Sequence, residues 1–107
     1  MQSIYIAGAG AGSGKSVVVL GFMELLSALN RRVGFFRPVV SRDVHEDNLT
    51  TLIRRRYDLP FPAERLYGCT AEQASELVAA GQYDELLKRI LDKYMLLEEE
   101  CDMVLCA

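Results

Sequence analysis

The sequence predicts an α/β layered fold with a mainly parallel sheet. Two observations support this fold class: short apolar segments that end at glycine or proline, and longer segments with helical spacing that alternate with them. Half of the 107 residues are hydrophobic and a quarter are charged, which is typical of a globular protein. We therefore expect residues 1–107 to form one domain, and the small number of predicted strands indicates a truncated one that continues in the parent protein.

The first half of the chain predicts two strands, each followed by a helix. Residues 2–7 are short and apolar and are followed by Gly8. A helix is expected over 15–30, a second strand over 33–36 that stops before Pro38, and a second helix over 46–57. The residues expected on the core faces of these two helices are Phe22, Leu25, Leu26 and Leu29, then Leu49, Leu52, Ile53 and Tyr57.

The second half predicts two more helices and a third strand. Thr70 and Gln73 have the spacing of a capping box, and Gly81 is placed to end the helix that this box opens. A longer helix is expected over 83–97, followed by a solvated Glu98–Glu100 and an apolar strand over 103–107. The expected core faces are Ala74, Leu77 and Val78 in the shorter helix, and Tyr83, Leu86, Leu87, Ile90, Leu91 and Tyr94 in the longer one.

Charge and hydropathy exclude several classes of partner. The formal net charge is -3 and no basic stripe is present, which argues against nucleic acid as the main partner. Arg54–Arg56 is interpreted as the solvated cationic end of a helix. The N-terminus lacks the pattern of a signal peptide, and no apolar run approaches the ~20 residues of a membrane span. We expect a cytoplasmic protein without a membrane partner.

Cysteine and histidine usage provides no metal or nucleophile pattern. Cys69, Cys101 and Cys106 are odd in number and show no C-x-x-C spacing, so we expect reduced, buried thiols. His45 is the single histidine, which argues against a catalytic triad or a multi-histidine metal site, although His45 can still contact a ligand. No catalytic residue is assigned from these types.

The segment "AGAGSGKS", from Ala9 to Ser16, matches the phosphate-binding pattern [AG]-x-x-x-x-G-K-[ST] between a predicted strand and a predicted helix. Its glycines allow backbone N–H groups to surround phosphate oxygens, Lys15 can neutralise the β and γ phosphates, and Ser16 can ligate Mg²⁺. A glycine-rich turn or a relic loop without nucleotide remains the alternative. The candidate binding residues for Mg²⁺ with ATP or another nucleoside triphosphate are Gly10, Ala11, Gly12, Ser13, Gly14, Lys15, Ser16 and Arg37.

Phosphoryl transfer also requires a second carboxylate on the metal ion. Asp102 precedes the third strand, at the wrong end for this role, and that strand has no acid at its carboxyl end. Asp47, at the start of the second helix, is the best remaining candidate, so the predicted metal ligands are Ser16 and Asp47. Asp47 is equally well explained as a charge that complements the helix dipole.

The whole chain resembles the amino-terminal domain of long-form bacterial phosphate acetyltransferases, a P-loop domain similar to dethiobiotin synthetase. The most specific stretches are the loop, "FRPV", and "AAGQYDELL" through "CDMVLCA". The resemblance implies a P-loop NTPase-like fold in a parent enzyme that interconverts acetyl-CoA plus phosphate with acetyl phosphate plus CoA. It implies a regulatory or assembly role for this segment, a downstream acetyltransferase domain, and homo-oligomers.

Individual residues follow from the same resemblance. Arg37 occupies the position of a synthetase lysine, and Asp47 matches an acid that helps to hold Mg²⁺ there. In the family the last strand continues into Glu-Gly, which would place the Walker-B-type acid directly after Ala107. Gly10 and Gly12 replace acids of the synthetases, which disfavours an ATP-dependent dethiobiotin synthetase-like ligase. That ligase and a non-binding oligomerisation scaffold are the two alternative functions.

Overall fold

The computed structural model describes residues 2–6, 15–41 and 48–107. Within these residues there are four strands and four α-helices, with a 3₁₀ turn before the third strand. In chain order they are β1 (Gln2–Tyr5), α1 (Lys15–Leu29), β2 (Val33–Val40), α2 (Asn48–Arg56), η2 (Ala63–Arg65), β3 (Tyr67–Thr70), α3 (Ala71–Ala79), α4 (Tyr83–Glu98) and β4 (Met103–Cys106).

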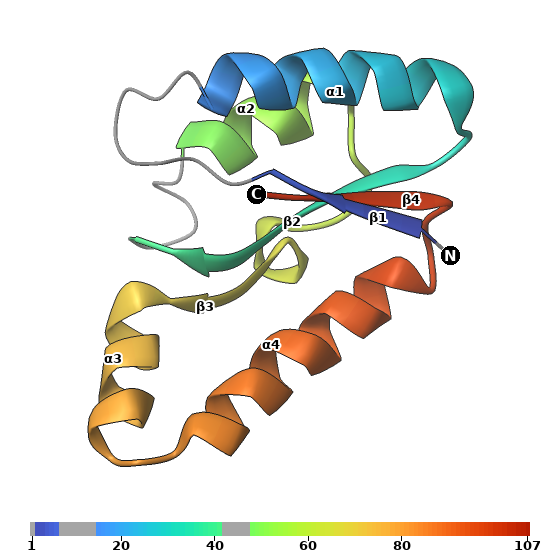
Figure 1. Cartoon of the computed structure of the whole chain (residues 1–107). Helices are drawn as coiled ribbons and strands as arrows, with labels where there is room; N and C mark the ends of the chain where they lie inside the picture. The colour runs from blue at the N-terminus through green and yellow to red at the C-terminus, as the bar shows by residue number, and fades with distance from the viewer. Residues whose placement is uncertain (1, 7–14, 42–47) are drawn as a thin grey trace.

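All four strands are parallel and lie in the order β1-β4-β2-β3, which confirms the predicted α/β class. The helices α1 and α2 cover one face of this sheet, and α3 and α4 lie on the other (Figure 1). Parallel sheets need both faces covered because each strand contributes apolar side chains to both. None of the described helices combines the length and hydropathy needed to span a bilayer.

Alternating side chains of the central strands β2 and β4 form two apolar clusters, one on each face of the sheet. Val33, Phe35, Met103 and Leu105 pack toward α1 and α2. Phe36, Val104 and Cys106 pack toward α4, where the ring of Phe36 meets that of Tyr94 edge-on at 5.6 Å. The period of two along each strand thus explains why these strands read as continuous apolar runs.

The core face of α1 differs from the predicted one. Val19, Met23 and Leu26 are buried against the sheet, whereas Phe22, Leu25 and Leu29 are largely exposed. The helix carries apolar residues around more than half of its circumference, so its spacing fits two faces about equally well. The face that packs on the sheet is displaced by about one residue from the predicted set.

The predicted faces of the other helices need similar corrections. In α2, Ile53 is buried and Leu52 is exposed; the described residues also bury Thr50 completely. In α3, Leu77 is buried but Val78 is not. In α4 the core side is formed by Leu86, Ile90, Tyr94 and Leu97, while the predicted Tyr83, Leu87 and Leu91 are exposed.

The ends of α3 follow the predicted capping chemistry. Thr70 accepts a hydrogen bond from the Gln73 backbone N–H, and the Gln73 side chain accepts one from the Thr70 N–H. Gly81, at φ +72°, ends the helix in a Schellman motif in which its N–H donates to Val78 and that of Gln82 donates to Leu77. The capping box and the glycine terminator are both confirmed.

The second strand continues past Pro38, where it was predicted to stop. The N–H of Arg37 donates to Leu66 at 2.9 Å, so the nitrogen of Pro38 faces the opposite side, beyond the last β4 residue paired with β2. Proline therefore removes no hydrogen bond between β2 and β3 at this position. The extension pairs with β3, a strand that was not predicted from the sequence because "YGCT" is short and contains a glycine.

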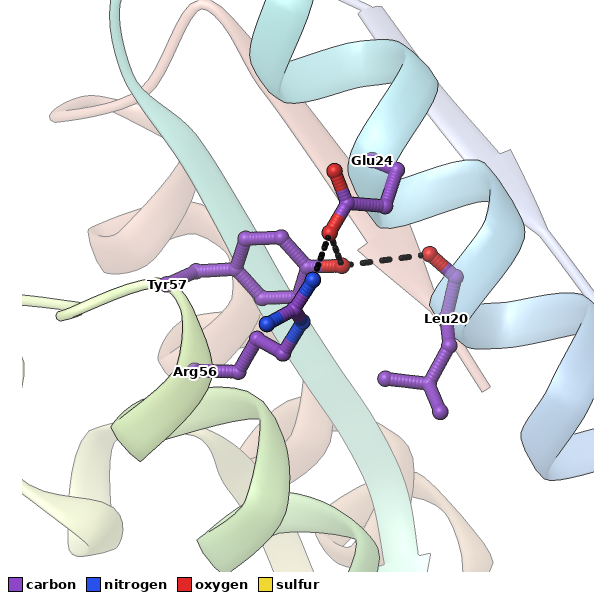
Figure 2. Close-up of polar contacts among 4 residues, drawn as sticks. All are labelled: Leu20, Glu24, Arg56 and Tyr57. Carbon is purple, nitrogen blue, oxygen red and sulfur yellow. Dashed lines mark hydrogen bonds and ion pairs between the residues drawn. The ribbon is translucent and has the colours of Figure 1, made fainter.

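Polar contacts join α1 to α2 on their shared side (Figure 2). The Tyr57 hydroxyl donates to the carboxylate of Glu24 at 3.0 Å and also lies 3.2 Å from the carbonyl oxygen of Leu20. Arg56 forms an ion pair of 2.7 Å with the same carboxylate. These hydrogen bonds, that of Tyr57 first, lower the pKa of Glu24. The basic end of α2 is therefore more than a solvated charge, since Arg54 also donates to Phe61 at 3.0 Å.

Candidate functional site

The candidate site lies at the carboxyl edge of the sheet, where β1 and β4 end beside Phe36 of β2. Tyr5 is level with Cys106, which is level with Phe36. The ladder is extended by one step, because Ile6 donates to Cys106 at 2.8 Å and Ala107 donates to Phe36 at 3.0 Å. Ligands of open parallel sheets bind at this edge, since loops and helix N-termini converge there.

Helix α1 begins at Lys15, and β1 ends at Tyr5, so the two elements flank most of the sequence that matches the phosphate-binding pattern. The first turn of α1 carries no acidic residue, and neither does that of α2, whereas α3 has Glu72 and α4 has Asp84 and Glu85. The backbone N–H groups of a first helical turn lack intrahelical partners and carry a partial positive charge. An N-terminus without a compensating carboxylate suits an anionic ligand, and the backbone at this edge therefore fits a phosphate group.

Most predicted site residues lie outside the described residues. They include Gly10, Ala11, Gly12, Ser13 and Gly14 of the loop, the side chains of Lys15 and Ser16, and both Asp47 and His45. The roles assigned to these residues remain predictions. The strand and the helix that flank the loop pattern are both present, as the pattern requires.

Arg37 is the predicted site residue whose position the structure describes. It is half-buried and lies one residue beyond Phe36 on β2, level with the end of β4. Because side chains alternate along a strand, Arg37 projects from the same face as Phe35, the face covered by α1 and α2. Arg37 therefore lies near the carboxyl end of β4 on this face, and its role toward a nucleotide remains a prediction.

Asp102 lies at the amino edge of the sheet, as predicted. Its carboxylate accepts a hydrogen bond of 3.0 Å from the Arg32 N–H, and its own N–H donates to the Arg32 carbonyl at 2.8 Å. This reciprocal pair joins the start of β4 to the start of β2. Asp102 therefore has a structural role and is remote from the carboxyl edge.

The three thiols are buried and form no disulfide, as expected. Burial raises the pKa of Cys101 and of Cys106 to about 11, so both are uncharged at neutral pH. Burial also raises the pKa of Cys69. Across the described part of the chain, no group of three His, Cys, Asp or Glu side chains is placed to hold a metal ion.

A polar hollow beside β3 was not predicted from the sequence. Lys93 of α4 places its ammonium group 4.2 Å from the centre of the Tyr67 ring, and Arg89 and Asp92 line the same hollow. Partial burial lowers the pKa of Lys93. These residues could not be singled out from the sequence because apolar residues lie between them on α4 and because β3 was not predicted.

Comparison with known proteins agrees with this architecture. A family model described as an AAA domain matches residues 2–106. Phosphate acetyltransferases from Nitratidesulfovibrio vulgaris and Synechocystis sp. are 42% and 34% identical to the chain, each over 98% of it, and one from Pseudomonas aeruginosa is 28% identical over the same share. The chain spans only 15% of the length of each of these proteins. The chain belongs to this AAA domain family and is homologous to the N-terminal region of phosphate acetyltransferases.

Proposed function

We propose that this domain binds the phosphate groups of a magnesium nucleotide, ATP or another nucleoside triphosphate, through Ala9–Ser16. The observation that supports the proposal best is the start of α1 at Lys15, behind β1 and without an acid in its first turn. Inorganic phosphate is the minimal ligand with the same chemistry. The loop glycines supply backbone N–H donors, and the helix N-terminus adds its dipole.

Each remaining site residue has a separate proposed role. Lys15 neutralises the outer phosphates, and the hydroxyl of Ser16 is a ligand of Mg²⁺. Asp47 supplies a carboxylate for the same ion, and Arg37 contributes a fixed positive charge from β2. The bound ion would screen the triphosphate charge. These residues bind and orient the nucleotide, and we assign no hydrolytic step to them.

We further propose that the domain regulates or assembles a phosphate acetyltransferase of which it forms the N-terminal part. Such an enzyme exchanges acetyl-CoA and phosphate for acetyl phosphate and CoA, and we propose that it acts in acetate metabolism in the cytoplasm. The homology to the N-terminal region of phosphate acetyltransferases supports this assignment. The acyl-transfer residues and the homo-oligomer would then involve chain outside residues 1–107.

Isothermal titration of the full-length gene product with Mg-ATP, Mg-GTP and inorganic phosphate tests the binding proposal. Lys15→Ala should weaken nucleotide affinity by about 10- to 100-fold, the usual loss for a charged hydrogen-bonding partner. Lys88→Ala is the matched control, because Lys88 is an exposed lysine on α4.

A folded wild-type protein that binds none of the three ligands would leave the non-binding scaffold as the better function. Equal affinity in the wild type and the Lys15→Ala variant would instead show that any nucleotide binds elsewhere. Production of a cyclic urea from a diamine, bicarbonate and ATP would favour the synthetase-like ligase.

A further inference from the structure

A polar hollow lies beside β3, where α4 packs against the sheet. Its volume is about 370 Å³, within the range of about 300 to 1,000 Å³ that is typical of small-molecule sites. The side chains that line it come from β3, α3 and α4: Tyr67, Cys69, Gln73, Arg89, Asp92 and Lys93. None of these residues belongs to the proposed nucleotide site, so the hollow is a separate place for a small ligand.

The amino group of Lys93 lies at the wall of this hollow. Its nitrogen is 4.2 Å from the centre of the Tyr67 ring, and the side chain is half-buried. Partial burial disfavours the charged form and lowers the pKa of Lys93. An amine that is more often neutral is a better nucleophile, and the contact with the ring keeps this one beside the hollow.

Arg89 supplies an anion-binding group next to this amine. It precedes Lys93 by four residues on α4, so the two side chains lie on the same side of the helix. Its ion pair with Glu85 uses the Nε atom at 3.2 Å and is about half exposed, so the pair is weak. The two Nη groups of the guanidinium can therefore donate to a phosphate, which arginine binds through paired hydrogen bonds.

The thiol of Cys69 does not compete with the amine of Lys93. Burial raises the pKa of Cys69, so its thiol is uncharged at neutral pH, and the thiol is a much weaker nucleophile than the thiolate. Cys69 is also only 2% exposed. The hollow thus combines an amine nucleophile with a cation that suits a phosphate.

We propose that Lys93 is an acylation site whose donor is an acyl phosphate, a small molecule with an activated acyl group and a phosphate dianion. Arg89 would bind the phosphate and thereby hold the acyl carbon beside the amine of Lys93. Acetyl phosphate, a product of the parent enzyme that we propose, is a donor of this class. The inference rests on the proposed function for this source alone, because the transfer itself requires only the hollow and the reagent.

The transfer balances without a further reactant. The neutral nitrogen of Lys93 forms a bond to the carbonyl carbon of the donor, and the bond from that carbon to the phosphate oxygen breaks. Hydrogen phosphate leaves with the proton that the nitrogen releases, and no group is oxidised or reduced. The product is a neutral amide, so acylation removes the positive charge from the Tyr67 ring and with it this contact between α4 and β3.

Treatment of the full-length gene product with acetyl phosphate, followed by peptide mass spectrometry, tests the proposal. Lys88 is the matched control, because it lies on the same helix and is exposed. Lys93 should be acetylated about 5- to 10-fold faster than Lys88, although it is less accessible, because the bound phosphate places the acyl group beside it. In protein unfolded by urea the two lysines should react at equal rates. The Lys15→Ala variant should show the same preference for Lys93, which separates this inference from nucleotide binding.

Acetic anhydride provides a second measurement, because it acylates amines but carries no phosphate. Arg89→Gln should lower the ratio of the acetyl phosphate rate to the acetic anhydride rate at Lys93 by about threefold, the size of a partly exposed ionic contact. An unchanged ratio would overturn the proposal, since Arg89 would then not hold the phosphate. Acetylation of Lys93 no faster than that of Lys88 in the folded protein would overturn it as well, and so would a preference for Lys93 that persists in urea.

Discussion

Replacement of Gly68 by alanine tests the packing of β3 against β2 and α4. A Cβ atom at Gly68 would lie 2.4 Å from the carbonyl oxygen of Pro38 and 2.9 Å from a side-chain carbon of Ile90. An ordinary contact begins at 3.4 Å, so β3 and β2 would have to separate by about 1 Å. That displacement would lengthen the 2.9 Å hydrogen bond from Arg37 to Leu66 beyond hydrogen-bonding range.

The expected cost combines these two effects. Overpacking costs about 1 to 3 kcal/mol, and a lost hydrogen bond adds about 1 kcal/mol, so Gly68→Ala should lower the free energy of unfolding by about 3 kcal/mol. With a urea dependence of about 1 to 1.5 kcal/mol per molar, the midpoint should fall by about 2 to 3 M in circular dichroism.

Gly21→Ala is the matched control for this substitution. Gly21 lies in α1, and a Cβ there meets nothing within 4 Å, so alanine should raise stability by up to about 1 kcal/mol through helix propensity. Equal urea midpoints for the Gly68→Ala and Gly21→Ala proteins would refute the close approach of β3 to β2.

Three further predictions concern the contact of Tyr57 with α1, the cap of α3 and two buried thiols. Tyr57→Phe removes the hydroxyl that contacts Glu24 and the Leu20 carbonyl of α1. The free energy of unfolding should fall by about 1 kcal/mol in urea titrations. Thr70→Ala removes half of the capping box and should cost about 1 kcal/mol, whereas Thr70→Ser should retain most of the stability. Burial raises the pKa of Cys101 and of Cys106 from 9.0 to about 11, so the folded state holds these protons more tightly than the unfolded state. The contribution of these protonated thiols to the free energy of unfolding is fully present below pH 9. As the pH rises toward 11, stability on the order of 2 kcal/mol per thiol should be lost, which urea midpoints would measure. A midpoint that is constant across this pH range would contradict the burial of both thiols.

Local chemistry accounts for the features that the sequence predicted well. The capping box at Thr70 and the terminator at Gly81 depend on side chains and backbone angles within a few residues, so they can be recognised without the rest of the fold. The alternation of strands and helices is equally local, because the spacing of hydrophobic residues within each segment indicates its type. The fold class followed from these signals, and so did the position of the loop pattern between β1 and α1.

Strand β3 and the continuation of β2 depend on partners far along the chain. Four residues with a glycine carry almost no strand signal by themselves, and β3 exists because its backbone pairs with β2. Pro38 looked like a strand terminator because proline cannot donate a hydrogen bond. Its nitrogen faces away from β3, so the pairing of β2 with β3 is kept, and this fact depends on the strand order.

The error in the predicted core face of α1 has a physical origin. A helix that covers only a sheet needs a single apolar face, and its spacing then identifies that face. A helix that must also pack sideways against another helix needs a wider apolar arc, and the spacing becomes ambiguous. In α1 the sequence contains both Val19, Met23 and Leu26, which are buried on the sheet, and Phe22 and Leu25, which the described chain leaves exposed. The apolar arc of α1 is therefore wider than the face that packs on the sheet, and its spacing alone does not identify that face.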